Sequence, residues 1–135
     1  MRFVDTNVLL YRISEDSNDV RKRRIAEDVL AGGDLALSAQ VLQEFYYQVT
    51  RNSRSGSLTP GEALRLVIAF SRFPVEPITQ DLVFAAIATH ERYQISYWDA
   101  AIIEAARLAG CDEVLSEDPA DGQEYAGVRV VNPFA

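Results

Sequence analysis

The sequence is short of cysteine, histidine and lysine. Each of these residue types occurs once among the 135 residues, as Cys111, His90 and Lys22. A single cysteine excludes a disulfide framework, and one cysteine with one histidine excludes zinc sites built from several such ligands. A catalytic pair in which a histidine works with a second base of the same kind is excluded as well, because the chain has only one histidine. Any chemistry must therefore be done by side chains that carry oxygen.

Long apolar runs are also absent. Hydrophobic residues make up 48% of the chain, but no run approaches the roughly 18 residues that a membrane span requires. The chain opens on a short apolar segment, without the charged region and following apolar region of a signal peptide. We therefore expect a single domain over residues 1–135 that lies in the cytoplasm and makes no use of a membrane.

Positive charge is scarce as well. Thirteen Lys and Arg residues face twenty Asp and Glu residues, for a net charge of -7, which argues against a general electrostatic grip on nucleic acid. In the basic run at 21–24, which includes Lys22, Arg23 and Arg24 lie four residues before Glu27 and Asp28, and this spacing predicts that the run is mainly a solvated helix face. Arg51 and Arg54 leave two interpretations open: a favourable helix C-terminus or a loop that contacts phosphate.

Strand-like and helix-like segments alternate along the chain. Short strands are predicted at 2–4, 34–37, 75–78, 113–116 and 128–131. This alternation predicts an α/β fold, a three-layer sandwich whose central parallel sheet of about five strands carries helices on both faces. The helix that begins with the capping box Thr59-Pro60-Gly61-Glu62 is expected to turn Leu64, Val67 and Ile68 inward.

Three aspartates occupy places where strands end or helices begin. Asp5 follows the first strand, Asp118 follows the fourth, and Asp99 lies in the first turn of a helix that starts at Ser96. Such positions converge at the carboxyl edge of a parallel sheet. Glu44 lies at the edge of its helix's apolar stripe, from where it can lean over the same rim. Each acid also has a simpler interpretation, as a helix cap, a capping-box residue, a turn residue or an exposed helix residue.

Converging carboxylates point to a metal ion. Several ionised acids in one cleft repel each other unless protons or cations neutralise them. A site made only of oxygen ligands suits Mg²⁺ or Mn²⁺. Two such ions roughly 3.5 to 4 Å apart would activate water and stabilise the leaving oxygen in phosphodiester cleavage.

Four short motifs, in this order and at this spacing, resemble the PIN-domain nucleases, particularly the VapC-type toxins of toxin–antitoxin pairs. The likeness covers nearly the whole chain. The motifs are Val4-Asp5-Thr6-Asn7, Gln43-Glu44-Phe45, Tyr97-Trp98-Asp99-Ala100, and Leu115-Ser116-Glu117-Asp118 followed by Val131-Asn132-Pro133-Phe134.

The resemblance implies a PIN-like fold and an endoribonuclease that depends on Mg²⁺ or Mn²⁺ and cleaves RNA. It also implies a homodimer, inhibited by a small cognate antitoxin whose tail covers the acidic pocket. The catalytic and metal-binding residues that it implies are Asp5, Asp99, Asp118 and, directly or through water, Glu44. The supporting residues that it implies are Thr6, Asn7 and Ser116, while Glu117 competes with its neighbour for the fourth acidic position.

Two other interpretations stay open. The chain can be a catalytically idle PIN-like binding module, or a PIN nuclease of RNA processing that is not a toxin. Three helix aromatics, Tyr46, Tyr47 and Phe70, are candidates for an interface with a second protein, with core packing as the simpler alternative. His90 continues an apolar stripe and is expected to be packed or hydrogen-bonded.

Overall fold

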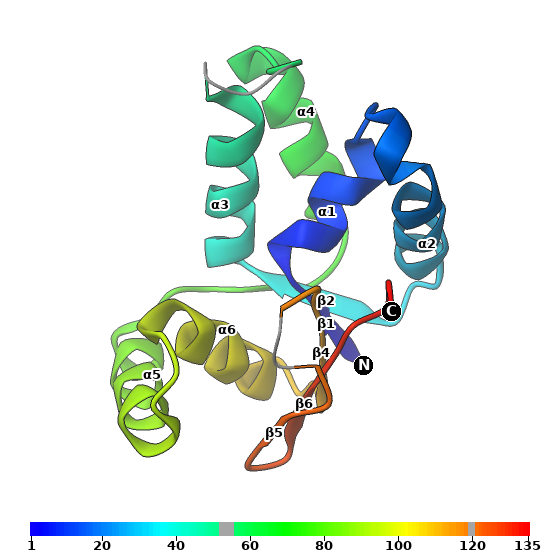
Figure 1. The fold of residues 1–135 in the computed structure, drawn as a ribbon. Helices are drawn as coiled ribbons and strands as arrows, with labels where there is room; N and C mark the ends of the chain where they lie inside the picture. The colour runs from blue at the N-terminus through cyan, green and yellow to red at the C-terminus, as the bar shows by residue number, and fades with distance from the viewer. Residues whose placement is uncertain (52–55, 119–120) are drawn as a thin grey trace.

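The structure is a computed structural model that describes residues 1–51, 56–118 and 121–135. A sheet of short strands lies at its centre, with helices on both faces (Figure 1). The strands are β1 (Arg2–Val4), β2 (Leu35–Ser38), β3 (Val75–Glu76), β4 (Glu113–Leu115), β5 (Glu124–Tyr125) and β6 (Val128–Val131). The helices are α1 (Thr6–Ile13), the 3-10 helix η1 (Ser17–Asp19), α2 (Val20–Ala31), α3 (Ala39–Thr50), α4 (Pro60–Phe70), α5 (Gln80–Tyr93) and α6 (Tyr97–Leu108).

The strands form one sheet in the order β3-β2-β1-β4-β6-β5. All neighbours are parallel except β5 and β6, which are antiparallel. The α/β sandwich and the five parallel strands predicted from the sequence are thus confirmed, and β5 is a sixth strand at the edge. Ala126 and Gly127 join β5 to β6 with φ of 50° and 94°, the left-handed backbone that a two-residue hairpin turn requires.

The helices form two layers and a projecting pair. Helix α6 packs on one face of the sheet and α5 packs outside it, while α1 and α2 lie together on the other side (Figure 1). Helices α3 and α4 pack against each other and extend beyond the carboxyl ends of the strands (Figure 1). The strands β1, β2 and β4 are buried along most of their length, as alternating α/β topology requires.

The inward face of α4 differs from the prediction. Leu64 and Ile68 are 55% and 63% exposed, while Ala63 and Phe70 are buried and Val67 is half-buried. The observed stripe includes Ala63, Val67 and Phe70 and thus shares only Val67 with the predicted one. Both stripes have helical spacing, so periodicity alone could not decide which of them packs against α3.

The aromatic candidates for an interface divide in two. Phe70 belongs to the core, where its ring packs edge-on against Phe45 at 5.2 Å, so its assignment to an interface is wrong. Tyr46 and Tyr47 remain on the surface, 39% and 65% exposed. The expectation for His90 is confirmed, because its Nδ1 is hydrogen-bonded with the Ile95 carbonyl.

The predicted arginine sites have mixed outcomes. Arg23 pairs with Glu27 at 3.9 Å, as the four-residue spacing predicted. Arg51 is the C-cap of α3, while Arg54 and the loop around it lie outside the described residues. Within the described parts of the chain, no helix has the length and apolar character needed to cross a membrane.

Candidate active site

Parallel pairing of β1 with β4 brings two of the acidic motifs together. Val4 lies opposite Leu115 in the register, and the Asp5 N–H donates to the Leu115 carbonyl at 3.1 Å. Both strands end here, so Asp5 and Ser116 emerge side by side at the carboxyl edge of the sheet. That is the edge where open α/β sheets bind their ligands.

Asp5 is both a helix cap and a pocket residue. Its Oδ1 accepts the Thr6 N–H at 2.7 Å as the N-cap of α1, and its Oδ2 accepts the Ser116 hydroxyl at 2.9 Å. Burial raises the pKa of Asp5 to about 6, and the charges of Glu44 and Asp99 push it in the same direction. Asp5 is therefore the N-cap of α1 and also lines the acidic pocket.

The hydroxyl of Ser116 connects this cap to the last acidic motif. It donates to Asp5 and accepts from the Asn7 side-chain amide at 3.2 Å and from the Asp118 N–H at 3.1 Å. One donor and two lone pairs are all that a hydroxyl has. Ser116 is thus fully used, and it links Asp5, Asn7 and Asp118, in keeping with a supporting role for Asn7 and Ser116.

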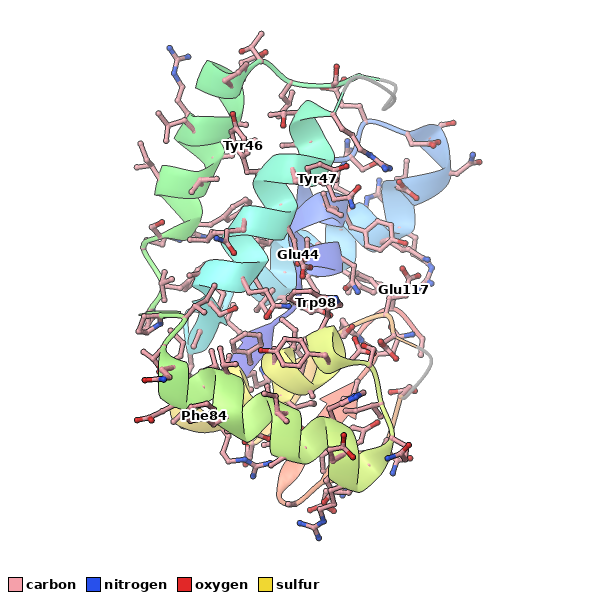
Figure 2. The ribbon with its side chains drawn as sticks, turned by 90° about the vertical axis from the view of Figure 1, so that its left-hand side faces the viewer. Glu44, Tyr46, Tyr47, Phe84, Trp98 and Glu117 are labelled. Atoms are coloured by element: carbon pink, nitrogen blue, oxygen red, sulfur yellow. The ribbon has the colours of Figure 1, made fainter. Side chains whose placement is uncertain are left out.

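Glu44 reaches the same region from α3. Its Oε2 accepts the Thr6 hydroxyl at 3.0 Å and its Oε1 accepts the Gln40 side-chain amide at 3.0 Å. Gln40 is buried and also donates to the Trp98 carbonyl at 3.4 Å, which ties α3 to the start of α6. Figure 2 shows Glu44 and the exposed Trp98 close together in this view. Sequence reasoning missed Gln40, although its place four residues before Glu44 is a usable signal.

Asp99 faces the pocket from the first turn of α6. Its N–H donates to the hydroxyl of the N-cap Ser96 at 3.1 Å, so the helix start that the sequence predicted is confirmed. Burial raises the pKa of Asp99, and the charges of Asp118 and Glu44 raise it further. The charges of Asp118 and Glu44 therefore act on Asp99. A role of Asp99 as a helix-capping residue alone would not explain this effect.

A pocket collects three of the four predicted acids. Asp5, Asp99 and Asp118 line it together with Ser116. Its other walls are mostly apolar, and they are Ile95, Ile102, Ile103, Val114, Tyr125 and Val130. Glu44 is not part of the lining and acts on the pocket through its charge and through Thr6. Tyr125 comes from the unpredicted strand β5, so sequence patterns alone could not place it here.

Glu117 turns away from this pocket. Its carboxylate accepts the hydroxyl of Tyr11 and forms an ion pair with Lys22 on α2. Although partial burial acts against it, these two contacts lower the pKa of Glu117. The competition between the two adjacent acids is thus decided in favour of Asp118 as the pocket residue. The run at 21–24 is mainly surface, as expected, but Lys22 is half-buried and pairs with Glu117, which lies in the C-terminal half of the chain.

The donor set fits a hard divalent cation in its chemistry. The polar groups that face the pocket are carboxylates and a hydroxyl, which Mg²⁺ and Mn²⁺ prefer. Burial, and to a lesser extent the charges of Glu44 and Asp99, raises the pKa of Asp5, and a bound cation would offset this cost of ionisation. Within residues 1–51, 56–118 and 121–135, no three Asp, Glu, His or Cys side chains come close enough together to hold an ion as they stand. Binding would require the acids to draw inward.

The fold and the pocket define a class, an α/β domain with an acidic site at the carboxyl edge of its sheet. The sequence matches the PIN domain family over residues 2–123, and the chain belongs to that family. This confirms the resemblance seen in the sequence. PIN domains as a family are nucleases.

Solved structures share this fold. A chain of a toxin–antitoxin complex from Klebsiella pneumoniae is 23% identical, with 98% of each chain covered and a TM-score of 0.70. Mycobacterium tuberculosis VapC20, described as a toxin that cleaves the sarcin–ricin loop, is 23% identical over 88% of this chain and 91% of its own, with a TM-score of 0.65. A chain of DNA-bound VapBC from Salmonella typhimurium is 19% identical over 98% and 97%, with a TM-score of 0.68. No curated protein matches the sequence.

Proposed function

We propose that this protein is an endoribonuclease that depends on Mg²⁺ or Mn²⁺. The observation that carries the proposal is the pocket at the carboxyl edge of the sheet, which Asp5, Asp99 and Asp118 line together, and where burial and acidic neighbours raise the pKa of Asp5 and of Asp99. A cluster that is costly when ionised is suited to holding a cation. The bound ion would supply an activated water and charge neutralisation at the scissile phosphodiester.

The chain's own residues divide into holders and supports. Asp5, Asp99 and Asp118 would bind the ion, and Glu44 would bind it directly or through water. Thr6, Asn7 and Ser116 keep the acids in place through the hydrogen bonds described above. The apolar walls of the pocket lower the local polarity and would so strengthen the electrostatic attraction between the acids and an ion.

We further infer that the substrate is RNA and that the protein is the toxin of a toxin–antitoxin pair. The support is the family together with the similar structures, one described as an RNA-cleaving toxin and others solved with an antitoxin. A small cognate antitoxin, a homodimeric assembly and a cytoplasmic location belong to the same proposal. Sedimentation of the purified protein tests the homodimer, since a monomer at micromolar concentration would contradict it.

The test of the activity is cleavage of single-stranded RNA with Mn²⁺ by the parent and by Asp5→Asn. The parent should cleave, EDTA should abolish cleavage, and Asp5→Asn should lose at least about a hundredfold in rate, as expected when a group acting on the transition state is lost. Asp28→Asn, an exposed change on α2 with the same loss of charge, is the matched control and should leave the rate unchanged. Equal rates for the parent and Asp5→Asn would remove the proposal.

The second candidate is a binding module whose acids hold a metal but cut nothing. The observation that favours it over an enzyme is the spacing of the acids, which in the described parts of the chain form no group of three close enough for an ion and are therefore not preorganised for catalysis. The two candidates differ in turnover. Stabilisation by Mn²⁺ without cleavage of any RNA would favour the module.

A further inference from the structure

Three side chains form a cluster beside the active site. Glu117, Lys22 and Tyr11, which we name the Glu117 tether, come from the segment after β4, from α2 and from α1. Lys22 Nζ pairs with Glu117 and also donates to the Tyr11 hydroxyl at 3.2 Å, while that hydroxyl donates to Glu117. Each member of the tether therefore contacts the other two.

Further contacts with the Tyr11 ring and with Phe134 hold the tether in place. Lys22 Nζ lies 4.8 Å from the centre of the Tyr11 ring, a cation–π contact, and the same ring packs edge-on against Phe134 at 4.9 Å. Arg21 donates to the Phe134 carbonyl at 2.6 Å, which fixes the end of the chain to α2. At 29% and 30% side-chain exposure, Glu117 and Lys22 are partly shielded from water. A surface pair with these supports is held in one geometry.

The backbone beside Glu117 is the backbone that places Asp118. The Glu117 N–H donates to the Asn7 side chain at 3.3 Å, and the next N–H, that of Asp118, donates to Ser116 at 3.1 Å. The tether thus adds a third attachment to a segment that α1 and Ser116 already hold. Figure 2 shows Glu117 at the edge of the molecule, to the side of Glu44.

We propose that Lys22 is a positioning residue of the active site. By pairing with Glu117, it holds that carboxylate on the α1–α2 side, so that Asp118 is the acid of this segment that lines the pocket. This inference rests on the proposed function in one respect, namely that Asp118 would bind a metal ion. The contacts of the tether lie within the protein and do not depend on that function. When Glu117 and Lys22 no longer pair, the segment that carries Asp118 loses one of its attachments, and Asp118 is held less firmly at the pocket.

The charge distribution supports the assignment. The other bases of the run at 21–24 in α2 are all arginines, and Arg23 forms an ion pair with Glu27 on the surface. Lys22 instead reaches a residue 95 positions later in the chain. An ammonium group is compact and can meet Glu117 and the Tyr11 hydroxyl together, whereas the contacts of a guanidinium are spread along a planar fork.

The test measures Mn²⁺ affinity by calorimetry in four proteins: the parent, Lys22→Ala, Glu117→Gln and the double variant. Lys22→Ala and Glu117→Gln should each weaken Mn²⁺ binding by about tenfold, the usual size of a second-layer effect on a metal site. If Lys22 acts through Glu117, the double variant should be no weaker than either single variant. Tyr11→Phe, which keeps the ring on Phe134 and removes only the hydroxyl, should show a smaller loss.

Arg24→Ala is the matched control, because it removes one positive charge from an exposed position of α2. It should bind Mn²⁺ as the parent does. Lys22→Arg, which keeps a cation, should retain more of the affinity than Lys22→Ala. Unchanged affinity in Lys22→Ala, or losses that multiply in the double variant, would overturn the positioning role.

Amide hydrogen exchange in EDTA gives a reading that needs no metal. The N–H groups of Glu117 and Asp118 should exchange at least about threefold faster in Lys22→Ala than in Arg24→Ala, since the segment opens locally. Equal exchange would contradict the tether even if Mn²⁺ affinity changed. If the parent binds Mn²⁺ but cuts no RNA, the proposed function fails while the tether stands. If the parent binds no Mn²⁺, the proposed metal site fails and the exchange result alone decides the tether.

Discussion

At the scale of single residues, Asp5 combines a stabilising and a destabilising role. It caps α1 and accepts the Ser116 hydroxyl, yet its burial and its acidic neighbours raise its pKa from 3.8 to about 6. A carboxyl whose folded pKa is raised binds its proton more tightly in the folded state. The folded state is therefore favoured at low pH, loses stability as the pH rises from about 4 to about 6, and carries the full penalty above that range.

Asp5→Asn should accordingly stabilise the metal-free protein at pH 7.5. Asparagine keeps an oxygen to cap α1 and removes the charge, so we expect a gain of about 1 to 3 kcal/mol, which is at most the value of the pKa shift. The gain should disappear at pH 4. Urea unfolding in EDTA at the two pH values measures it, and a loss of stability at pH 7.5 would show that capping outweighs repulsion.

Ser116 is the other residue where a small change should have a large effect. Ser116→Ala removes the hydroxyl shared by Asp5, Asn7 and the Asp118 N–H. Because partly buried groups then lose their partner, we expect a loss of about 1 to 3 kcal/mol of unfolding free energy. The loss of the hydrogen bond that now lowers the pKa of Asp5 should raise that pKa further. Denaturation and carboxyl NMR titration check the two effects, with the exposed Ser57→Ala as control.

At the scale of elements, the hairpin of β5 and β6 depends on α6. Arg107 donates to the Tyr125 carbonyl at 2.9 Å and to the Ala126 carbonyl at 2.6 Å. Its partner Glu104 is buried and also accepts the Thr89 hydroxyl at 2.8 Å. Since Tyr125 lines the pocket, these hydrogen bonds of Arg107 connect the helix that carries Asp99 to another lining residue of the same pocket.

Arg107→Met should weaken the attachment of the β5–β6 hairpin to α6. It leaves two carbonyls and a buried carboxylate short of a donor, so we expect a loss of about 1 to 3 kcal/mol in urea unfolding. The control is Arg129→Met, whose pair with Glu124 is 3.7 Å long and 55% exposed on both sides. An exposed pair contributes at most about 1 kcal/mol, and equal losses in the two variants would contradict a special role for Arg107.

The elements also show what the sequence could and could not predict. The parallel strands, the helix starts at Thr59 and Ser96 and the acids at strand ends followed from periodicity, capping and topology. β5 did not, because two residues are too few to show an alternating pattern. The predicted stripe of α4 was right at Val67 and wrong at Leu64 and Ile68, because these two are as apolar as the residues that pack. The tether was missed because nothing local marks a contact between Lys22 and Glu117.

At the scale of the whole molecule, a net charge of -7 conflicts with a polyanionic substrate. Metal-free protein should bind single-stranded RNA weakly, and the little binding that remains should fall steeply as salt rises, because only local arginines can contact phosphate. Fluorescence anisotropy of labelled RNA in EDTA, at two salt concentrations, measures this. Tight binding that does not change with the salt concentration would show that the protein binds RNA without the help of a cation.

The central claim is that the acids at the carboxyl edge form one metal site, and thermal melting with and without Mn²⁺ tests it most directly. Metal that binds only the folded state raises the melting temperature. We expect Mn²⁺ to raise it in the parent and in Asp28→Asn, and to leave Asp5→Asn and Asp99→Asn almost unchanged. An equal rise of the melting temperature in all four proteins, or no rise in the parent, would contradict the account. The acids would then be only helix-capping and turn residues.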